Sequence, residues 1–137
     1  MTPDQIFAIV NPLAALSWLA LIAVPRRAAI VTGLVVPMLF ALLYAGLIGG
    51  HWSGARGGFS TLPEVAQLFA NPWLLLAGWV HYLCFDLLIG TWEVQDAQAR
   101  GISHLLVVPC LVLTFLFGPT GWVLYKGLAS LHPRPKA

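Results

Sequence analysis

Two uninterrupted apolar stretches near the start of the chain constrain its fold more than any other feature. Residues 6–24 and 28–50 contain no Asp, Glu, Lys, Arg or His and are separated by Pro25, Arg26 and Arg27. About 20 helical residues span the roughly 30 Å hydrocarbon core of a bilayer. Helix is favoured there because lipid offers the backbone no hydrogen-bond partners. These stretches therefore predict two transmembrane helices.

Two further apolar stretches, about residues 72–92 and 104–128, predict a third and a fourth transmembrane helix. Asn71 and Pro72 form a helix-start signal for the third, and Pro109 and Gly118-Pro119 are expected to distort the fourth. Four crossings would place both termini on one side of the membrane. The basic residues would then divide too evenly between the two sides for the positive-inside rule to assign an orientation.

The polar segment between the second and third stretches predicts a loop followed by a short amphipathic helix. Thr61 and Glu64 have the spacing of an N-terminal capping box. Apolar residues then recur at helical spacing, at Leu62, Val65, Leu68 and Phe69. Such a helix is expected to lie in the membrane interface.

The composition agrees with a membrane-embedded chain. Of its 137 residues, 59% are hydrophobic and 9% are charged, against about 25% charged in a soluble domain. So few charges cannot cover a surface that faces water, and the bilayer is the expected partner. We predict an all-α, multi-pass membrane protein with one domain over residues 1–137, as a four-helix bundle. The net charge of +2, without a basic stripe, gives no sign of nucleic-acid binding.

Ionisable residues gather between His81 and His104, and Asp86 is the main candidate for chemistry. Counted from Pro72 at 1.5 Å per residue, Asp86 lies about 21 Å along the third helix, inside the hydrocarbon layer. A charged carboxyl there costs about 2.5–3.5 kcal/mol, so it should face a partner or a wet cavity. A carboxyl that keeps its proton could act as an acid or a base. The alternative is a structural hydrogen bond to a neighbouring helix.

His81 is the second catalytic candidate, near the middle of the bilayer. It stands about 140° around a regular helix from Asp86, so a direct pair would need a distorted helix. The alternative interpretation is a neutral histidine that only packs.

The predicted substrate-binding residues are a cluster of polar side chains near the end of the third helix and one residue of the first helix. Asp96 and Arg100 have the i,i+4 spacing of an ion pair. One interpretation is a solvated helix end, and the other is a polar mouth above Asp86. The candidates are Glu93, Asp96, Arg100, His104 and Asn11. Glu93, Asp96 and His104 could also hold a metal, but no HExxH-type spacing appears, and none is predicted. No cofactor motif appears either, so no cofactor is expected.

Several strings of residues resemble the abscisic-acid-deficient-4 (ABA4-like) family of integral membrane proteins. They are NPWLLLAGWVHYLCFDL over residues 71–87, DAQARGISH over 96–104, Pro109-Cys110, and FLFGP over 115–119. Asn11 and Pro25-Arg26 also fit. The likeness covers nearly the whole chain and implies four transmembrane helices. Because no plastid transit peptide precedes the first span, we expect a bacterial member, located in the inner membrane.

In plants this family is linked to making neoxanthin from violaxanthin, which converts a carotenoid epoxide into an allenic alcohol without net redox change. That chemistry needs an acid and a base. The resemblance thus favours a membrane isomerase, or a helper of one, for a carotenoid or related isoprenoid. Asp86 would donate the proton, His81 would assist or accept one, and the polar mouth would receive a hydroxylated ring end.

Two other functions stay open on the sequence. The first is a non-catalytic membrane protein that binds a carotenoid or quinone or helps assembly. The second is a metal-dependent membrane enzyme. The oligomeric state is also open, with a homo-oligomer among the options.

Overall fold

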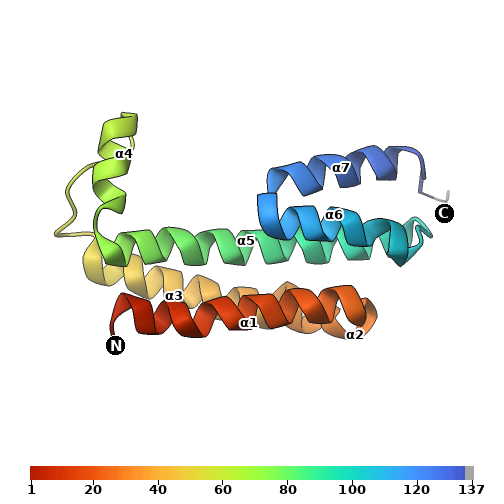
Figure 1. Cartoon of the computed structure of the whole chain (residues 1–137), viewed down its shortest axis with the longest axis horizontal. Helices are drawn as coiled ribbons and strands as arrows, with labels where there is room; N and C mark the ends of the chain where they lie inside the picture. Colours follow the sequence, from red (N-terminus) through yellow and green to blue (C-terminus); the bar gives the residue numbers. More distant parts are fainter. Residues whose placement is uncertain (135–137) are drawn as a thin grey trace.

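The computed structural model describes residues 1–134, and every element of regular structure within that range is helical (Figure 1). Three helical stretches are long and apolar enough to cross a membrane: Pro3–Ala23, Arg27–His51 and Pro72–Ala99. The elements are α1 (Pro3–Ala23), α2 (Pro25–Ile30), the π-helix η1 (Val31–Val35), α3 (Val36–His51), α4 (Leu62–Phe69), α5 (Pro72–Ala99), α6 (His104–Phe117) and α7 (Pro119–Ser130).

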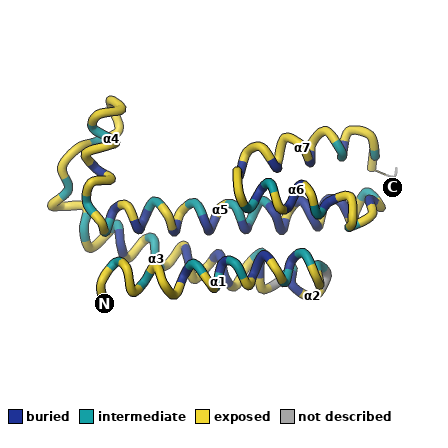
Figure 2. Tube along the Cα trace, in the orientation of Figure 1, coloured by how far each residue is buried: buried dark blue, intermediate teal, exposed yellow. Residues whose placement is uncertain are grey.

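The 28-residue helix α5 is the centre of the molecule. Helices α1 and α3 cover one side of it, and α6 and α7 lie on the other side (Figure 1). The buried residues form a line along α5 where these helices meet it, whereas much of the outer surface of α7 is exposed (Figure 2). Trp18, Phe40 and Leu87 are among the largest side chains of this core.

The second predicted span is helical throughout but changes to π geometry just before Pro37. Proline has no N–H to donate, and its ring clashes with the carbonyl four residues earlier, so the wider π turn accommodates it. The π segment is tied to α5, because Thr91 Oγ1 donates to Thr32 Oγ1 at 3.0 Å. Gly33 lies against Thr91 so closely that a Cβ there would come within 2.8 Å of its methyl carbon.

The fourth predicted span differs from expectation, because residues 104–128 do not form one crossing helix. The chain reverses at Gly118, and α7 runs back beside α6 (Figure 1). Proline disfavours helical geometry in the residue before it, and Gly118 adopts a φ of +42°, which glycine reaches at little cost. Pro119 then begins α7, where its missing N–H costs nothing. The fourth span is thus a helical hairpin.

This hairpin changes where the chain ends. With three helices long enough to cross a membrane and one hairpin, the N-terminus and the described C-terminal residues lie at opposite ends of the molecule (Figure 1). Four crossings would have placed them on one side.

Helix α4 begins where the capping pattern predicts. The Glu64 N–H donates to Thr61 Oγ1 at 3.3 Å, and the Glu64 carboxylate accepts from the Ser60 N–H at 3.2 Å. The helix stands crosswise to α5 and projects from the bundle (Figure 1). Leu62 and Phe69 are exposed on it, while Leu68 is buried. An interfacial position for α4 stays a prediction.

Candidate functional site

Asp86 lies on α5 opposite the turn of the α6–α7 hairpin. Gly118 is in direct contact with it, because a Cβ on that glycine would lie 3.2 Å from Asp86 Oδ1. Asp86 Oδ2 is buried and has no hydrogen-bond partner within residues 1–134. Buried polar atoms in proteins nearly always have a partner. A buried carboxyl oxygen without one therefore marks Asp86 as the candidate centre of a site.

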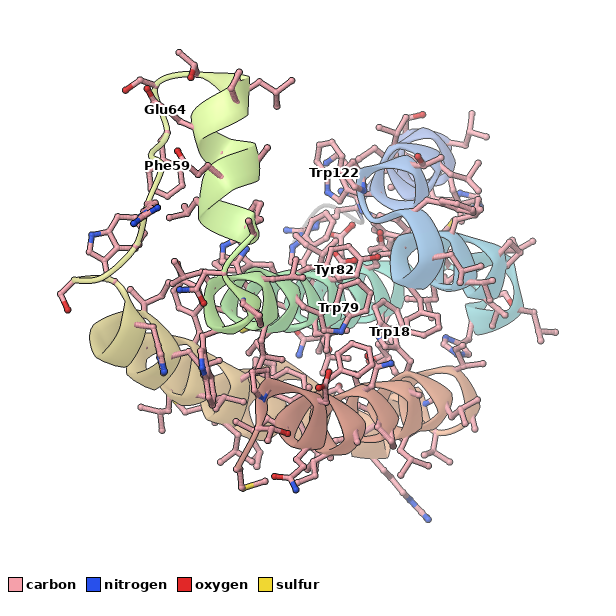
Figure 3. The ribbon with its side chains drawn as sticks, turned by 60° about the vertical axis from the view of Figure 1, so that its left-hand side comes forward. Trp18, Phe59, Glu64, Trp79, Tyr82 and Trp122 are labelled. Atoms are coloured by element: carbon pink, nitrogen blue, oxygen red, sulfur yellow. The ribbon has the colours of Figure 1, made fainter. Side chains whose placement is uncertain are left out.

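A cavity of about 290 Å³ opens beside this carboxyl. We call it the Asp86 cavity, and it is lined by Asp86, Ile89, Gly118, Pro119 and Trp122. Apart from Asp86 its walls are mostly apolar. Figure 3 shows Trp122 on α7, on the same side of α5 as Tyr82. An apolar cavity with one polar group suits a ligand that is largely hydrocarbon and carries a single oxygen at that point.

Tyr82 stands one helical turn before Asp86 on α5. Its hydroxyl donates to the Phe115 carbonyl of α6 at 3.1 Å. This bond fixes α6 near its C-terminal end, just before the hairpin turn, and so helps to hold Gly118 against Asp86. The i,i+4 spacing of Tyr82 and Asp86 is visible in the sequence, but the role of Tyr82 depends on where α6 ends.

Glu93 is the second carboxyl that the structure places inside the bundle, and it does not line the Asp86 cavity. Its side chain is fully buried, and Thr114 Oγ1 of α6 donates to it at 3.0 Å. Gly121 of α7 closes over Thr114, since a Cβ there would come within 2.1 Å of the Thr114 nitrogen. Glu93 therefore has no open surface on which to bind a substrate.

Asp96 and Arg100 form the expected ion pair, with Nε and Oδ2 2.7 Å apart. Asp96 also accepts hydrogen bonds from Tyr125 of α7 and from Arg134. Arg100 in turn donates to the backbone carbonyls of Ala129 and His132. We call Asp96, Arg100, Tyr125 and Arg134 the C-terminal clasp. These contacts join α7 to α5, so Asp96 and Arg100 hold the hairpin and do not form an open mouth above Asp86.

The other two predicted binding residues also make contacts between helices. His104 Nε2 lies 2.8 Å from the Ile22 carbonyl, which joins the start of α6 to the end of α1. Asn11 Oδ1 accepts from Trp79 Nε1 at 2.9 Å, which joins α1 to α5. Neither residue lines the Asp86 cavity.

His81 is not brought to Asp86. Its ring packs against Tyr44 and Phe85, with centroid distances of 5.5 and 4.7 Å, and it lines a different cavity, under α4. Because α5 is α-helical across both positions, the 140° offset expected from the sequence keeps the two side chains apart. The predicted pair of Asp86 and His81 is therefore not assembled.

The alternative metal site is not assembled either. Glu93 faces Thr114, Asp96 is in the C-terminal clasp, and His104 reaches α1. Within residues 1–134, no three His, Cys, Asp or Glu side chains are grouped in a way that could hold a metal ion.

Comparison with known proteins identifies one family. The sequence model of the ABA4-like family, described as ABA DEFICIENT 4-like, matches residues 5–125. No curated protein and no solved structure matches the chain.

Proposed function

We propose, because the chain belongs to the ABA4-like family, that it acts within the membrane on a carotenoid or a related isoprenoid, as an epoxide isomerase or a helper of one. The observation that supports this most is the Asp86 carboxyl, which has an unpartnered oxygen beside a largely apolar cavity. Such a site suits a hydrocarbon ligand with one reactive oxygen at its end.

Asp86 can supply both of the proton transfers that this isomerisation needs. As the acid, it protonates the epoxide oxygen while the C–O bond nearer the polyene breaks. The oxygen stays on the other ring carbon as an alcohol. The positive charge on the polyene side is then lost when the adjacent vinyl carbon releases its proton, which forms the allene. The Asp86 carboxylate accepts that proton, so no atoms or electrons are gained or lost.

His81 takes no part in either proton transfer. His81 lines another cavity, and Glu93 is enclosed by α6 and α7. Among the described residues that line the Asp86 cavity, Asp86 is thus the one ionisable group. A single carboxyl that donates a proton and then recovers one requires no second catalytic group.

The substitution Asp86→Asn tests the proposal, with purified full-length chain in liposomes that contain violaxanthin. We expect the wild-type protein to form an allenic product. Because Asn cannot exchange a proton, the variant should lose about 10²- to 10⁴-fold in rate. Chromatography of the extracted pigments measures the rate of product formation for the wild type and for the variant.

The matched control is Asp4→Asn, at the exposed start of α1, which should leave the rate unchanged. Absence of product with the wild-type chain, together with retained pigment, would favour the non-catalytic carotenoid-binding function instead. An equal rate for Asp86→Asn and the wild type would exclude Asp86 as the acid.

A further inference from the structure

A second and larger cavity, of about 530 Å³, lies where α4 meets α3 and α5. We call it the α4 cavity, and it has no part in the proton transfers described above. Its lining is mostly aromatic and aliphatic, and consists of Tyr44, Ile48, Trp52, Phe59, Leu68, Phe69, Leu74, Gly78 and His81. Trp52 and Phe59 stack on each other with ring centroids 5.6 Å apart. This lining suits a bulky apolar ring.

The cavity depends on a close approach between α4 and α5. A Cβ at Gly78 would lie 2.9 Å from the Phe69 ring, so a larger residue there would push α4 away. The cavity is therefore built by a specific contact and is not a chance gap beside a projecting helix.

Two polar groups enter this apolar lining side by side. The rings of Tyr44 and His81 are 5.5 Å apart, and neither side chain hydrogen-bonds to another of residues 1–134. A phenol O–H and an imidazole N–H both donate hydrogen bonds, and each can accept one. Together they can bind a hydroxyl or a carbonyl oxygen on a ring that fills the cavity.

One partly exposed strip of α5 connects the α4 cavity to the Asp86 cavity. Gly78, Phe85 and Ile89 lie within about 40° of one another around the helix. Phe85 is 54% exposed and contacts His81, while Ile89 lines the Asp86 cavity. Helix α4 stands crosswise on one side of α5, and α7 runs parallel to α5 on the same side (Figure 1). Phe59 lies beside α4 and Trp122 lies on α7 (Figure 3).

The distance along this strip suits a long ligand. From Leu74 in the α4 cavity to Ile89 in the Asp86 cavity is 15 residues, or about 22 Å along the helix. A compact metabolite cannot reach both cavities, whereas an extended isoprenoid with a ring at each end can.

We infer that the α4 cavity binds the far, oxygenated ring end of the same isoprenoid whose near end contacts Asp86. Tyr44 and His81 bind the ring oxygen, and the chain of the ligand lies on Phe85. This inference rests on the proposed function for the identity of the ligand. It gives His81 a binding role in place of a catalytic one.

Binding of zeaxanthin tests the inference, because this carotenoid has a hydroxyl on each ring but no epoxide to react. The full chain is reconstituted in nanodiscs, and quenching of its tryptophan fluorescence gives the Kd. Tyr44→Phe and His81→Phe keep the aromatic packing but remove hydrogen-bonding groups, so each should weaken binding about fivefold. Ile48→Trp fills the cavity and should weaken it more than tenfold.

The control variant is His132→Phe, at the end of the chain far from α4, which should leave the Kd unchanged. Unchanged binding in Tyr44→Phe, His81→Phe and Ile48→Trp, with normal turnover of violaxanthin, would overturn the inference and leave the proposed function intact. Weakened zeaxanthin binding in these variants, with no turnover of violaxanthin by the wild type, would support ring binding in the α4 cavity and count against the isomerase function. Tight binding of a short-chain quinone in place of zeaxanthin, lost in the same variants, would also overturn the inference.

Discussion

At the scale of single residues, contact between Gly90 and Trp18 sets how closely α1 approaches α5. Trp18 is 2% exposed, and a Cβ at Gly90 would lie 2.3 Å from its ring. The tryptophan ring also packs against Phe115 of α6, with centroids 5.5 Å apart. One glycine on the central helix therefore determines the position of a large side chain that connects three helices.

Gly90→Ala is expected to destabilise the protein. The added methyl group would push the Trp18 ring, and overpacking of this kind costs about 1–3 kcal/mol. Unfolding in detergent, followed by circular dichroism, measures the change. Gly46→Ala is the matched control, because nothing lies within 4 Å of the Cβ that it adds. Its expected effect is neutral or slightly stabilising, since alanine favours helix over glycine. Equal stability of both variants would contradict the contact.

At the scale of elements, the open end of the α6–α7 hairpin is held to α5 by a cluster of charged and polar side chains. The Asp96 carboxylate accepts hydrogen bonds from Arg100, Tyr125 and Arg134, and almost none of it is exposed. A buried carboxylate is tolerated only where charged and hydrogen-bonding partners compensate it. The C-terminal clasp therefore positions α7 and, through α7, the Asp86 cavity at the other end of the hairpin.

Asp96→Asn is expected to release α7 from α5. The substitution leaves the Arg100 guanidinium without its counter-charge. Because the Arg100 side chain is 19% exposed, the cost should lie below the about 3–5 kcal/mol of breaking a fully buried pair. The rate of tryptic cleavage at Lys126 in α7 measures the release, and it should be higher in the variant than in the wild type.

Arg134→Ala tests how much the exposed part of the C-terminal clasp contributes to stability, apart from its buried part. Its side chain is 61% exposed, so losing it should cost less than about 1 kcal/mol. A larger effect for Arg134→Ala than for Asp96→Asn would contradict the assignment of Asp96 as the centre of the clasp.

At the scale of the whole molecule, the hairpin redistributes the basic residues between the two ends of the bundle. Arg27 of α2, Arg100 and Arg134 lie at the end where α1 meets α2 and α5 meets α6. Arg56 lies in the loop before α4, at the opposite end (Figure 1). Four crossings would have divided the positive charge evenly, whereas three crossings and a hairpin concentrate it at one end.

We therefore predict that the C-terminus faces the cytoplasm and the N-terminus faces the other side, following the positive-inside rule. Fusions of green fluorescent protein and of alkaline phosphatase to each end of the chain, expressed in bacteria, measure this. The fluorescent protein should be active at the C-terminus, and the phosphatase at the N-terminus. Activity of the same reporter at both termini would contradict the three-crossing arrangement.

The sequence by itself determined the helical class, the three long spans and the start of α4. Long apolar stretches have few folded options in lipid, where each backbone group must find its partner within the same helix. Capping residues and prolines act over only a few residues, so their effects are readable locally. For the same reason, the offset between His81 and Asp86 could be predicted from helix geometry alone.

Only the tertiary structure decided the reversal at Gly118, the contacts of Asp96 and Arg100, and the cavity beside Asp86. Gly118-Pro119 predicts a disturbance, but whether the helix kinks or turns back depends on contacts outside this dipeptide. One is the hydrogen bond from Tyr82, in a distant part of the chain, to Phe115, and another is the close packing of Gly121 on Thr114 across the hairpin. A polar residue in a membrane helix must be satisfied, and its partner is chosen by packing. The sequence could thus identify the carboxyl groups as candidates for the site. It could not show that Asp96 holds the hairpin while Asp86 faces an open cavity.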